Sequence, residues 1–266
     1  MLELTLRVGA ADVEEVLDAI LPALPGGLHL RHDGEAVELR ILDTPETPNE
    51  EELLALAGPR LIELTAAEVS DDWRRRRLDR YQPLVVGERF LLRPEWAPPS
   101  EDPSLIEIVL EQSPAFGTGL HPTTQACLAT LAEVEPGGSF ADLGCGSGVL
   151  SIAAARLGWS PIVAVDIDPT SVAVTRDNAA RNGVEIDARR VDIASEPPPE
   201  ADTVVANIPP AVQLALAAGL ESAPSLLIAS GFKPDEIPAV ASAWNGHGLQ
   251  IDDEVRAHEW SVLVMR

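Results

Sequence analysis

The feature that most constrains the fold is a glycine-rich segment, residues 142–148, with the sequence Asp-Leu-Gly-Cys-Gly-Ser-Gly. A short apolar run at 138–141 precedes it and predicts a strand, whereas the alanine-rich run at 149–157 has the apolar spacing of a helix. In such a strand–loop–helix unit a small ligand can approach the backbone N–H groups at the start of the helix. The sequence therefore predicts an α/β domain with a ligand site at this loop.

An acidic residue follows this loop at the spacing expected for a nucleoside cofactor. The β-branched run at residues 162–165 ends in Asp166, which lies 22 residues after Gly144. In Rossmann-type sites an acid at the end of the next strand, about 20 residues on, binds a ribose hydroxyl. We expect this role for Asp166, and we expect the cofactor to approach the backbone at Gly144 and Gly146.

The glycine spacing distinguishes between two cofactors. A dinucleotide fingerprint, G-x-G-x-x-G, would place its third glycine at position 149, where the chain has Val149. The carboxylate of Asp142, next to the loop, would repel a pyrophosphate, whereas it suits the amino group or the sulfonium of S-adenosylmethionine (SAM). Charge complementarity therefore favours SAM over NAD.

Later strands bring further polar side chains to the same edge of the predicted sheet. Residues 203–207 are typical of a fully buried strand and end in Asn207, at the edge where open α/β sheets bind ligands. A third strand closes at 191–192, and the carboxylate of Asp192 is expected either to accept from an adenine amino group or to cap its own loop. Residues from 249 to 265 predict a terminal antiparallel pair.

The first 67 residues predict a separate small domain. Its expected elements are a strand at 2–8, a helix after Asp12, a hairpin around Asp33-Gly34, a helix at 51–57 and a strand at 61–64. This β-α-β-β-α-β order is that of a ferredoxin-like α+β domain, for which we expect a role in substrate recognition. Residues 68–83, with four consecutive arginines, predict a helical linker, and the Rossmann-like domain takes 84–266.

Charge and composition limit the partners of the chain. Its 266 residues carry 43 acids against 19 bases, a net charge of −24, which disfavours free nucleic acid because phosphate binding needs clustered cations. The same charge either attracts a basic partner or maintains solubility. No apolar run approaches the ~18 residues of a membrane span, and Cys127 and Cys145 are typical of reduced thiols. We expect a cytoplasmic monomer without a metal site.

Several segments together resemble the PrmA family, whose members methylate large-ribosomal-subunit protein L-eleven. They are residues 116–124 (Phe-Gly-Thr-Gly-Leu-His-Pro-Thr-Thr), 142–148, 165–168, 177–183 and 206–208. The first segment is the family-specific one, because most SAM-dependent methyltransferases share the glycine loop. The resemblance implies a Rossmann-like class I SAM-dependent methyltransferase domain preceded by a small ferredoxin-like domain.

The same resemblance implies roles for individual residues. Thr123, Gly144, Asp166 and Asn207 would contact SAM, and Phe116 and His121 would lie in the loop that lines the reaction centre. Asn207 would accept hydrogen bonds from a lysine or N-terminal amine of a basic ribosomal protein, whereas His121 is expected to orient rather than to act as a base. The alternatives are a methyltransferase of the same core acting on another protein or a small molecule, an NAD-dependent oxidoreductase, and a SAM-binding module without catalysis.

Overall fold

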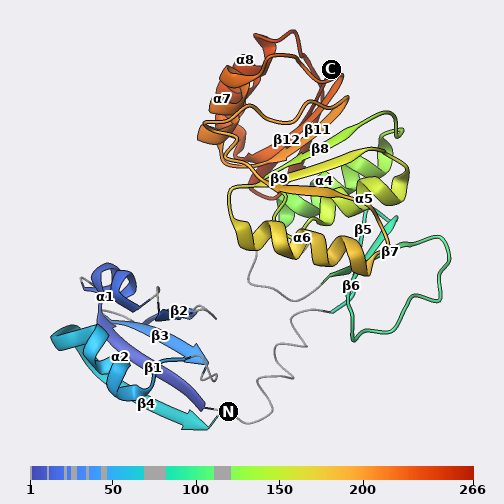
Figure 1. Cartoon of the computed structure of the whole chain (residues 1–266). Coiled ribbons are helices and arrows are strands. Elements are labelled where there is room, and N and C mark those ends of the chain that lie inside the picture. Colours follow the sequence, from blue (N-terminus) through green and yellow to red (C-terminus); the bar gives the residue numbers. More distant parts are fainter. Residues whose placement is uncertain are drawn as a thin grey trace. The chain divides into compact units, whose positions relative to one another are not determined.

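The computed structural model describes residues 2–10, 12–20, 23–24, 29–33, 36–42, 47–68, 82–110 and 121–266. Two compact units make up the chain, Met1–Arg80 and Tyr81–Arg266 (Figure 1). The predicted linker at 68–83 falls mostly outside the described residues, so its helical form stays a prediction. Phe116 also lies outside the described residues.

The first unit is an antiparallel sheet packed against α-helices. Its elements are β1 (Leu2–Gly9), α1 (Val13–Ile20), β2 (His29–Asp33), β3 (Ala36–Leu42), α2 (Glu50–Ala57), a 3-10 turn (Gly58–Arg60) and β4 (Leu61–Glu68). The strands lie in the order β2-β3-β1-β4, and each neighbouring pair is antiparallel. Leu4, Leu6 and Val8 alternate along β1 and pack with Val16 of α1 and Leu53 of α2. The β-α-β-β-α-β order of elements predicted from the sequence is confirmed.

The second unit contains a seven-stranded sheet in the order β10-β9-β8-β11-β12-β14-β13 and a three-stranded sheet, β5-β6-β7. The strands are β5 (Leu84–Val86), β6 (Phe90–Pro94), β7 (Ile106–Leu110), β8 (Phe140–Leu143), β9 (Ile162–Asp166), β10 (Asp187–Arg190), β11 (Thr203–Asn207), β12 (Leu226–Phe232), β13 (Ile251–Ala257) and β14 (Trp260–Met265). Strands β8 to β12 pair in parallel, whereas β14 is antiparallel to both its neighbours. This is a Rossmann-like sheet, and the predicted terminal antiparallel pair is confirmed.

Helices cover both faces of the large sheet. They are α4 (Pro122–Glu133), α5 (Val149–Leu157), α6 (Pro169–Arg181), α7 (Pro210–Gly219) and α8 (Ile237–Asn245), with a 3-10 turn at Pro234–Glu236 (Figure 1). Alternate residues of one strand enter different cores: Phe140 packs in the cluster that contains residues of α4 and α5, and Ala141 in the cluster that contains residues of α7 and α8. Burial on both faces explains why β8, β9, β11 and β12 are largely apolar, whereas the edge strand β10 is mostly charged and exposed.

Local sequence signals fix the ends of α6. The carboxylate of Asp168 accepts from the backbone N–H of Thr170 at 2.8 Å, and Pro169 occupies the first helical position. Gly183 follows the last turn with a φ of +62°. In the ranges that the structure describes, no helix combines the length and the apolar character needed to traverse a bilayer.

Candidate active site

The order of the parallel strands changes direction between β8 and β11, and ligands of open α/β sheets bind at the carboxyl ends of strands at such a point. From β8 the chain proceeds to β9 and β10 on one side, and from β11 to β12 on the other. Gly144 directly follows β8 and Asn207 ends β11, next to the ladder pair of Leu143 with Ala206. The fold thus brings two of the predicted site residues to the same point of the sheet edge.

The glycine loop is held in a conformation that needs its glycines. Gly144, Gly146 and Gly148 have φ values of +81°, +54° and +77°, which L side chains rarely adopt. The N–H of Gly144 donates to the carbonyl of Val165 at 2.8 Å, which ties the loop to β9. A Cβ on Gly144 would lie 2.5 Å from Cγ2 of Ile208, so this glycine permits the close approach of the loops that follow β8 and β11.

Asp166 ends β9, and its carboxylate connects the glycine loop to the turn before α6. Oδ2 accepts from the N–H of Gly146 and Oδ1 from the N–H of Asp168, both at 2.9 Å. These bonds hold the carboxylate at the carboxyl edge of the sheet, and a carboxylate has lone pairs left for further donors. The position agrees with a ribose-binding role for Asp166, which stays a prediction.

Asp142 lies beneath the loop. It is 1% exposed, and its Oδ2 accepts from the backbone N–H and the hydroxyl of Ser151 at 3.1 and 2.6 Å. Burial raises the pKa of this carboxyl to about 6, although the Ser151 hydrogen bonds act in the opposite direction. Asp142 therefore anchors the first turn of α5. The glycine spacing favours SAM over NAD more strongly than the charge of Asp142 does.

The raised pKa of Asp142 predicts a pH dependence of stability. The native carboxyl releases its proton near pH 6 and the unfolded one near 3.8, so the native state binds more protons in this window and its stability falls as the pH rises through it. Asp142→Asn keeps an acceptor for Ser151 and removes the titration. We expect the difference in Tm, wild type minus variant, to be about 3 °C larger at pH 5 than at pH 8. A difference in Tm that does not change with pH would contradict this assignment.

Asp192 does not end a strand, contrary to the prediction, because β10 stops at Arg190. Its N–H donates to Glu196 Oε1 at 3.1 Å, and its carboxylate accepts from Ala194 N at 3.1 Å and Ser195 Oγ at 2.7 Å. The turn that these hydrogen bonds close does not continue the strand. The contacts are those of the loop-capping role, and an adenine contact by Asp192 stays a prediction.

Asn207 is half-buried at the end of β11, and no residue in the described ranges hydrogen-bonds its side-chain amide. The backbone around it is fixed: the N–H of Ile208 donates to Ser230 O at 3.0 Å, and the buried Gln213 amide donates to Ala206 O at 2.8 Å and to Ser230 O at 3.1 Å. A polar amide on an anchored backbone at the ligand edge is suited to orienting a hydrogen-bonding substrate.

Gly231 in β12 supports the same backbone. Its φ is +94°, and a Cβ there would lie 2.4 Å from the carbonyl oxygen of Ile208 and 2.8 Å from its nitrogen. We expect Gly231→Ala to displace Ile208 and Asn207, to lower the Tm by several degrees and to reduce turnover about tenfold. The matched control is Gly219→Ala at the end of α7, where nothing lies within 4 Å of the added Cβ. Its Tm and turnover should stay near wild type, and wild-type turnover in a folded Gly231→Ala would contradict the role of Gly231.

His121 and Thr123 contact each other at the start of α4. His121 is the N-cap residue, and its Nδ1 accepts from the N–H of Thr123 at 3.3 Å and lies 2.7 Å from the Thr123 hydroxyl oxygen. In a neutral ring an accepting Nδ1 leaves the proton on Nε2. These contacts agree with an orienting role for His121. The Thr123 hydroxyl, predicted to contact SAM, belongs to a residue that is 1% exposed and has this ring as a partner.

Thr124 and Trp260 are two residues to which the sequence argument gave no role in the site. Thr124 is 2% exposed, and its hydroxyl has no hydrogen-bond partner in the described part of the chain. An unpaired buried hydroxyl costs free energy, so at this edge it is a candidate to bind a ligand. The ring of Trp260 packs edge-on against His121, with 5.3 Å between centroids. The motif at 116–124 contained the signal for Thr124, whereas nothing local marked Trp260.

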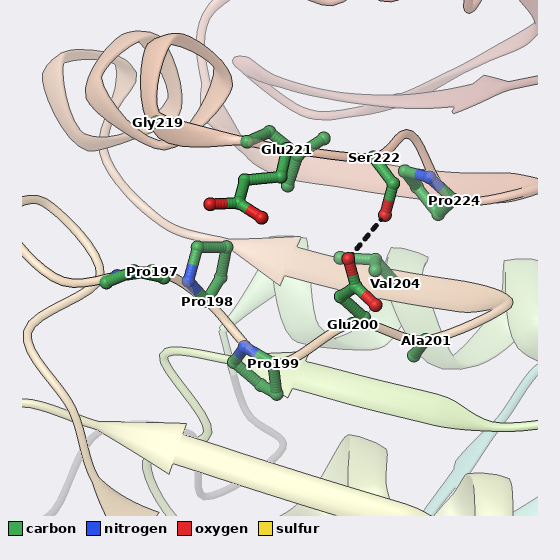
Figure 2. Close-up of a pocket in the computed structure, with 11 residues that line it drawn as sticks. Pro197, Pro198, Pro199, Glu200, Ala201, Val204, Gly219, Glu221, Ser222 and Pro224 are labelled. Carbon is green, nitrogen blue, oxygen red and sulfur yellow. Dashed lines mark hydrogen bonds between the residues drawn. The ribbon is translucent and has the colours of Figure 1, made fainter.

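A second feature, the hollow shown in Figure 2, lies at the opposite edge of the sheet. It has a volume of about 160 Å³ and is lined by segments next to the amino ends of β11 and β12, among them Pro197 to Pro199, Glu200 and Glu221. In Figure 2 the hydroxyl of Ser222 points to Glu200 Oε1, with 2.8 Å between the oxygens. None of the predicted site residues lines this hollow, so it is separate from the candidate active site.

Both cysteines of the chain lie inside the second unit. Cys127 and Cys145 are both buried free thiols, and burial raises the pKa of Cys127 to about 12. The side chain of Cys145, within the glycine loop, packs with Ala164 and Val172. Within the described ranges no three His, Cys, Asp or Glu side chains form a group that could hold a metal ion.

Comparisons with known proteins show which family this chain is similar to. The family described as ribosomal protein L11 methyltransferase (PrmA) matches residues 47–266. A ribosomal protein L11 methyltransferase of Pseudomonas paraeruginosa is 38% identical over 224 residues, 82% of this chain and 76% of the relative. One from Geobacter metallireducens is 34% identical, over 85% of this chain and 80% of the relative. The crystal structure of a ribosomal protein L11 methylase from Lactobacillus delbrueckii subsp. bulgaricus superposes with a TM-score of 0.62 at 29% identity, covering 70% of this chain and 98% of that one.

Proposed function

This chain belongs to the ribosomal protein L11 methyltransferase family, and from that premise we propose that it methylates lysine or N-terminal amines of ribosomal protein L11. It is a SAM-dependent methyltransferase. The observation that carries the assignment of the site is the approach of the loops after β8 and β11, where Gly144 faces Ile208 and Asn207 ends its strand.

The residues at this edge fit SAM. Only a glycine at position 144 leaves room for Ile208. The buried hydroxyl of Thr124 has no hydrogen-bond partner among the described residues, so it is available to a ligand. We assign the backbone of Gly144 and Gly146 to the cofactor, Asp166 to its ribose, and the threonines at 123 and 124 to further contacts. SAM, when bound, supplies an electrophilic methyl group that carries its own leaving group.

The protein then has to orient the acceptor amine. The Asn207 side-chain oxygen is the group placed to accept from the amine N–H and to aim the nitrogen lone pair, because its backbone is fixed by Ser230 and Gly231. Desolvation near Trp260 and His121 favours the neutral form of a lysine amine, and water can take up the proton. The net charge of −24 attracts a basic ribosomal protein.

The first unit is assigned to recognition of the protein substrate. Its strand order, β2-β3-β1-β4, supports a ferredoxin-like fold, and within its described residues nothing resembles the glycine loop or the Asn207 edge. We place the enzyme in the cytoplasm as a monomer, in keeping with its two free thiols.

The proposal is tested by incubating the full chain with labelled SAM and purified ribosomal protein L11, beside a metabolite extract. Label on lysine or N-terminal amines of L11, located by mass spectrometry, supports the proposed substrate. Label only on small molecules favours the alternative methyltransferase. Calorimetric titration with SAM and with NADH separates the cofactor classes, and binding of NADH alone would refute the assignment.

A further inference from the structure

Helix α6 and the residue that follows it bury polar side chains. Thr175 and Asn178 of α6 and its C-cap residue Asn182, spaced by three and four residues, are 0%, 0% and 3% exposed. An amphipathic helix normally buries apolar side chains on its inner face, and a buried polar group costs free energy unless it is hydrogen-bonded. The partners of these three side chains therefore indicate what this face of α6 holds in place.

Two of the three bind the glycine loop. Thr175 Oγ1 donates to the carbonyl of Gly146 at 3.0 Å, and Asn178 Nδ2 donates to the carbonyl of Ser147 at 2.9 Å. Gly148 also packs on this face, since a Cβ there would lie 2.8 Å from Thr175 Cγ2. Two successive carbonyl groups of the loop are thus turned towards α6.

The direction of these carbonyls decides where the neighbouring N–H groups point. In a trans peptide the C=O and the N–H point in opposite directions. The N–H groups of Ser147 and Gly148 are therefore turned away from α6. That of Gly148 closes the loop by donating to Cys145 O at 2.8 Å. Backbone amides at the start of a helix are the groups that ligands of such loops meet.

The third side chain binds a different segment. Asn182 Oδ1 accepts from the N–H of Val109 at 2.8 Å, and its Nδ2 donates to the carbonyl of Val109 at 2.7 Å, as a neighbouring strand would. Val109 lies in β7. The buried side of α6 and its C-cap residue therefore fix both the glycine loop and strand β7.

We propose that Thr175 and Asn178 are positioning residues for SAM: they fix the glycine loop through the carbonyl groups of Gly146 and Ser147. The inference rests on the proposed function, because that function places the cofactor at the glycine loop. Asn182 fixes strand β7 instead of the loop, so it serves as a control.

A matched pair of variants tests the positioning role of Thr175 in SAM binding. Thr175→Val keeps the shape of the side chain and removes the donor to Gly146, whereas Thr175→Ser keeps the hydroxyl. By calorimetry we expect SAM to bind about tenfold more weakly to Thr175→Val and within about twofold of wild type to Thr175→Ser. Equal SAM affinity in the two folded variants would overturn the role of Thr175. If Thr175→Val does not fold, Asn178→Ala takes its place, with the same tenfold loss expected and wild-type affinity overturning the proposal.

Asn182→Ala is the control on the same side of α6, because it removes the bonds to Val109 and leaves those to the glycine loop. We expect its SAM affinity to stay within about threefold of wild type. A loss of SAM affinity equal to that of Thr175→Val, as from general destabilisation, would overturn the positioning role of Thr175 and Asn178. If the wild-type enzyme itself does not bind SAM, the proposed function fails instead, so the two failures are distinguishable.

Discussion

Asp166→Ala is expected to weaken SAM binding by about 100-fold. The variant loses the carboxylate assigned to the ribose hydroxyls, and it also loses the acceptor that holds the N–H groups of Gly146 and Asp168, each at 2.9 Å. A hydrogen bond to a charged group contributes about 1.5–3 kcal/mol, so the loss of the ribose contact together with the loop anchor is large enough for this effect. Calorimetric titration of the folded variant with SAM gives the dissociation constant directly.

The matched control is Asp168→Ala, which removes an exposed carboxylate two residues further along the chain. Asp168 caps α6 through the N–H of Thr170, so its loss should reduce stability by about 1 kcal/mol. SAM affinity should stay within about threefold of wild type because Asp168 has no assigned cofactor contact. Wild-type SAM affinity in folded Asp166→Ala, or an equal loss in both variants, would show that Asp166 has no special role.

The elements that form the site could be predicted because their signals are local. The helix at Val149–Leu157 and the strands at Ile162–Asp166 and Thr203–Asn207 have the predicted bounds. Each is delimited by a residue beside it, such as the glycine before α5 or the acid at the end of β9, and its apolar pattern is continuous. The alternation of strands and helices along the chain predicted a Rossmann-like domain, whereas the order of the strands in the sheet came from the structure.

The direction of single side chains could not be predicted in the same way. Asp142 and Asp192 have carboxylates at the expected places in the sequence, yet Asp142 turns to Ser151 under the loop and Asp192 to the turn that follows it. The sequence shows that a carboxylate is near a loop, whereas its partner depends on backbone geometry. The contacts of His121 with Trp260 and of Asn182 with Val109 join distant segments, the latter 73 residues apart, and no local pattern reports them.

Contacts with β12 give Asn207 its expected importance for turnover. A side-chain amide can orient an amine only if its own backbone does not move, and here the Ile208 N–H is bonded to Ser230 while Gly231 packs on the Ile208 carbonyl. The predicted role of Asn207 therefore depends on a support that belongs to β12, a strand to which the sequence argument gave no function.

Asn207→Ala is expected to reduce kcat with ribosomal protein L11 by about 100-fold and to change SAM affinity by less than about fivefold. The amide is assigned to aligning the acceptor nitrogen, and a misaligned reactant loses about that factor, whereas the residues assigned to the cofactor, Gly144 and Asp166, are unchanged. Asn245→Ala, at the exposed end of α8, is the control of the same residue type and should keep wild-type kcat. Single-turnover methylation with saturating SAM measures the chemical step. A normal single-turnover rate in Asn207→Ala would remove Asn207 from the reaction centre, and a loss confined to SAM affinity would make it a cofactor ligand only.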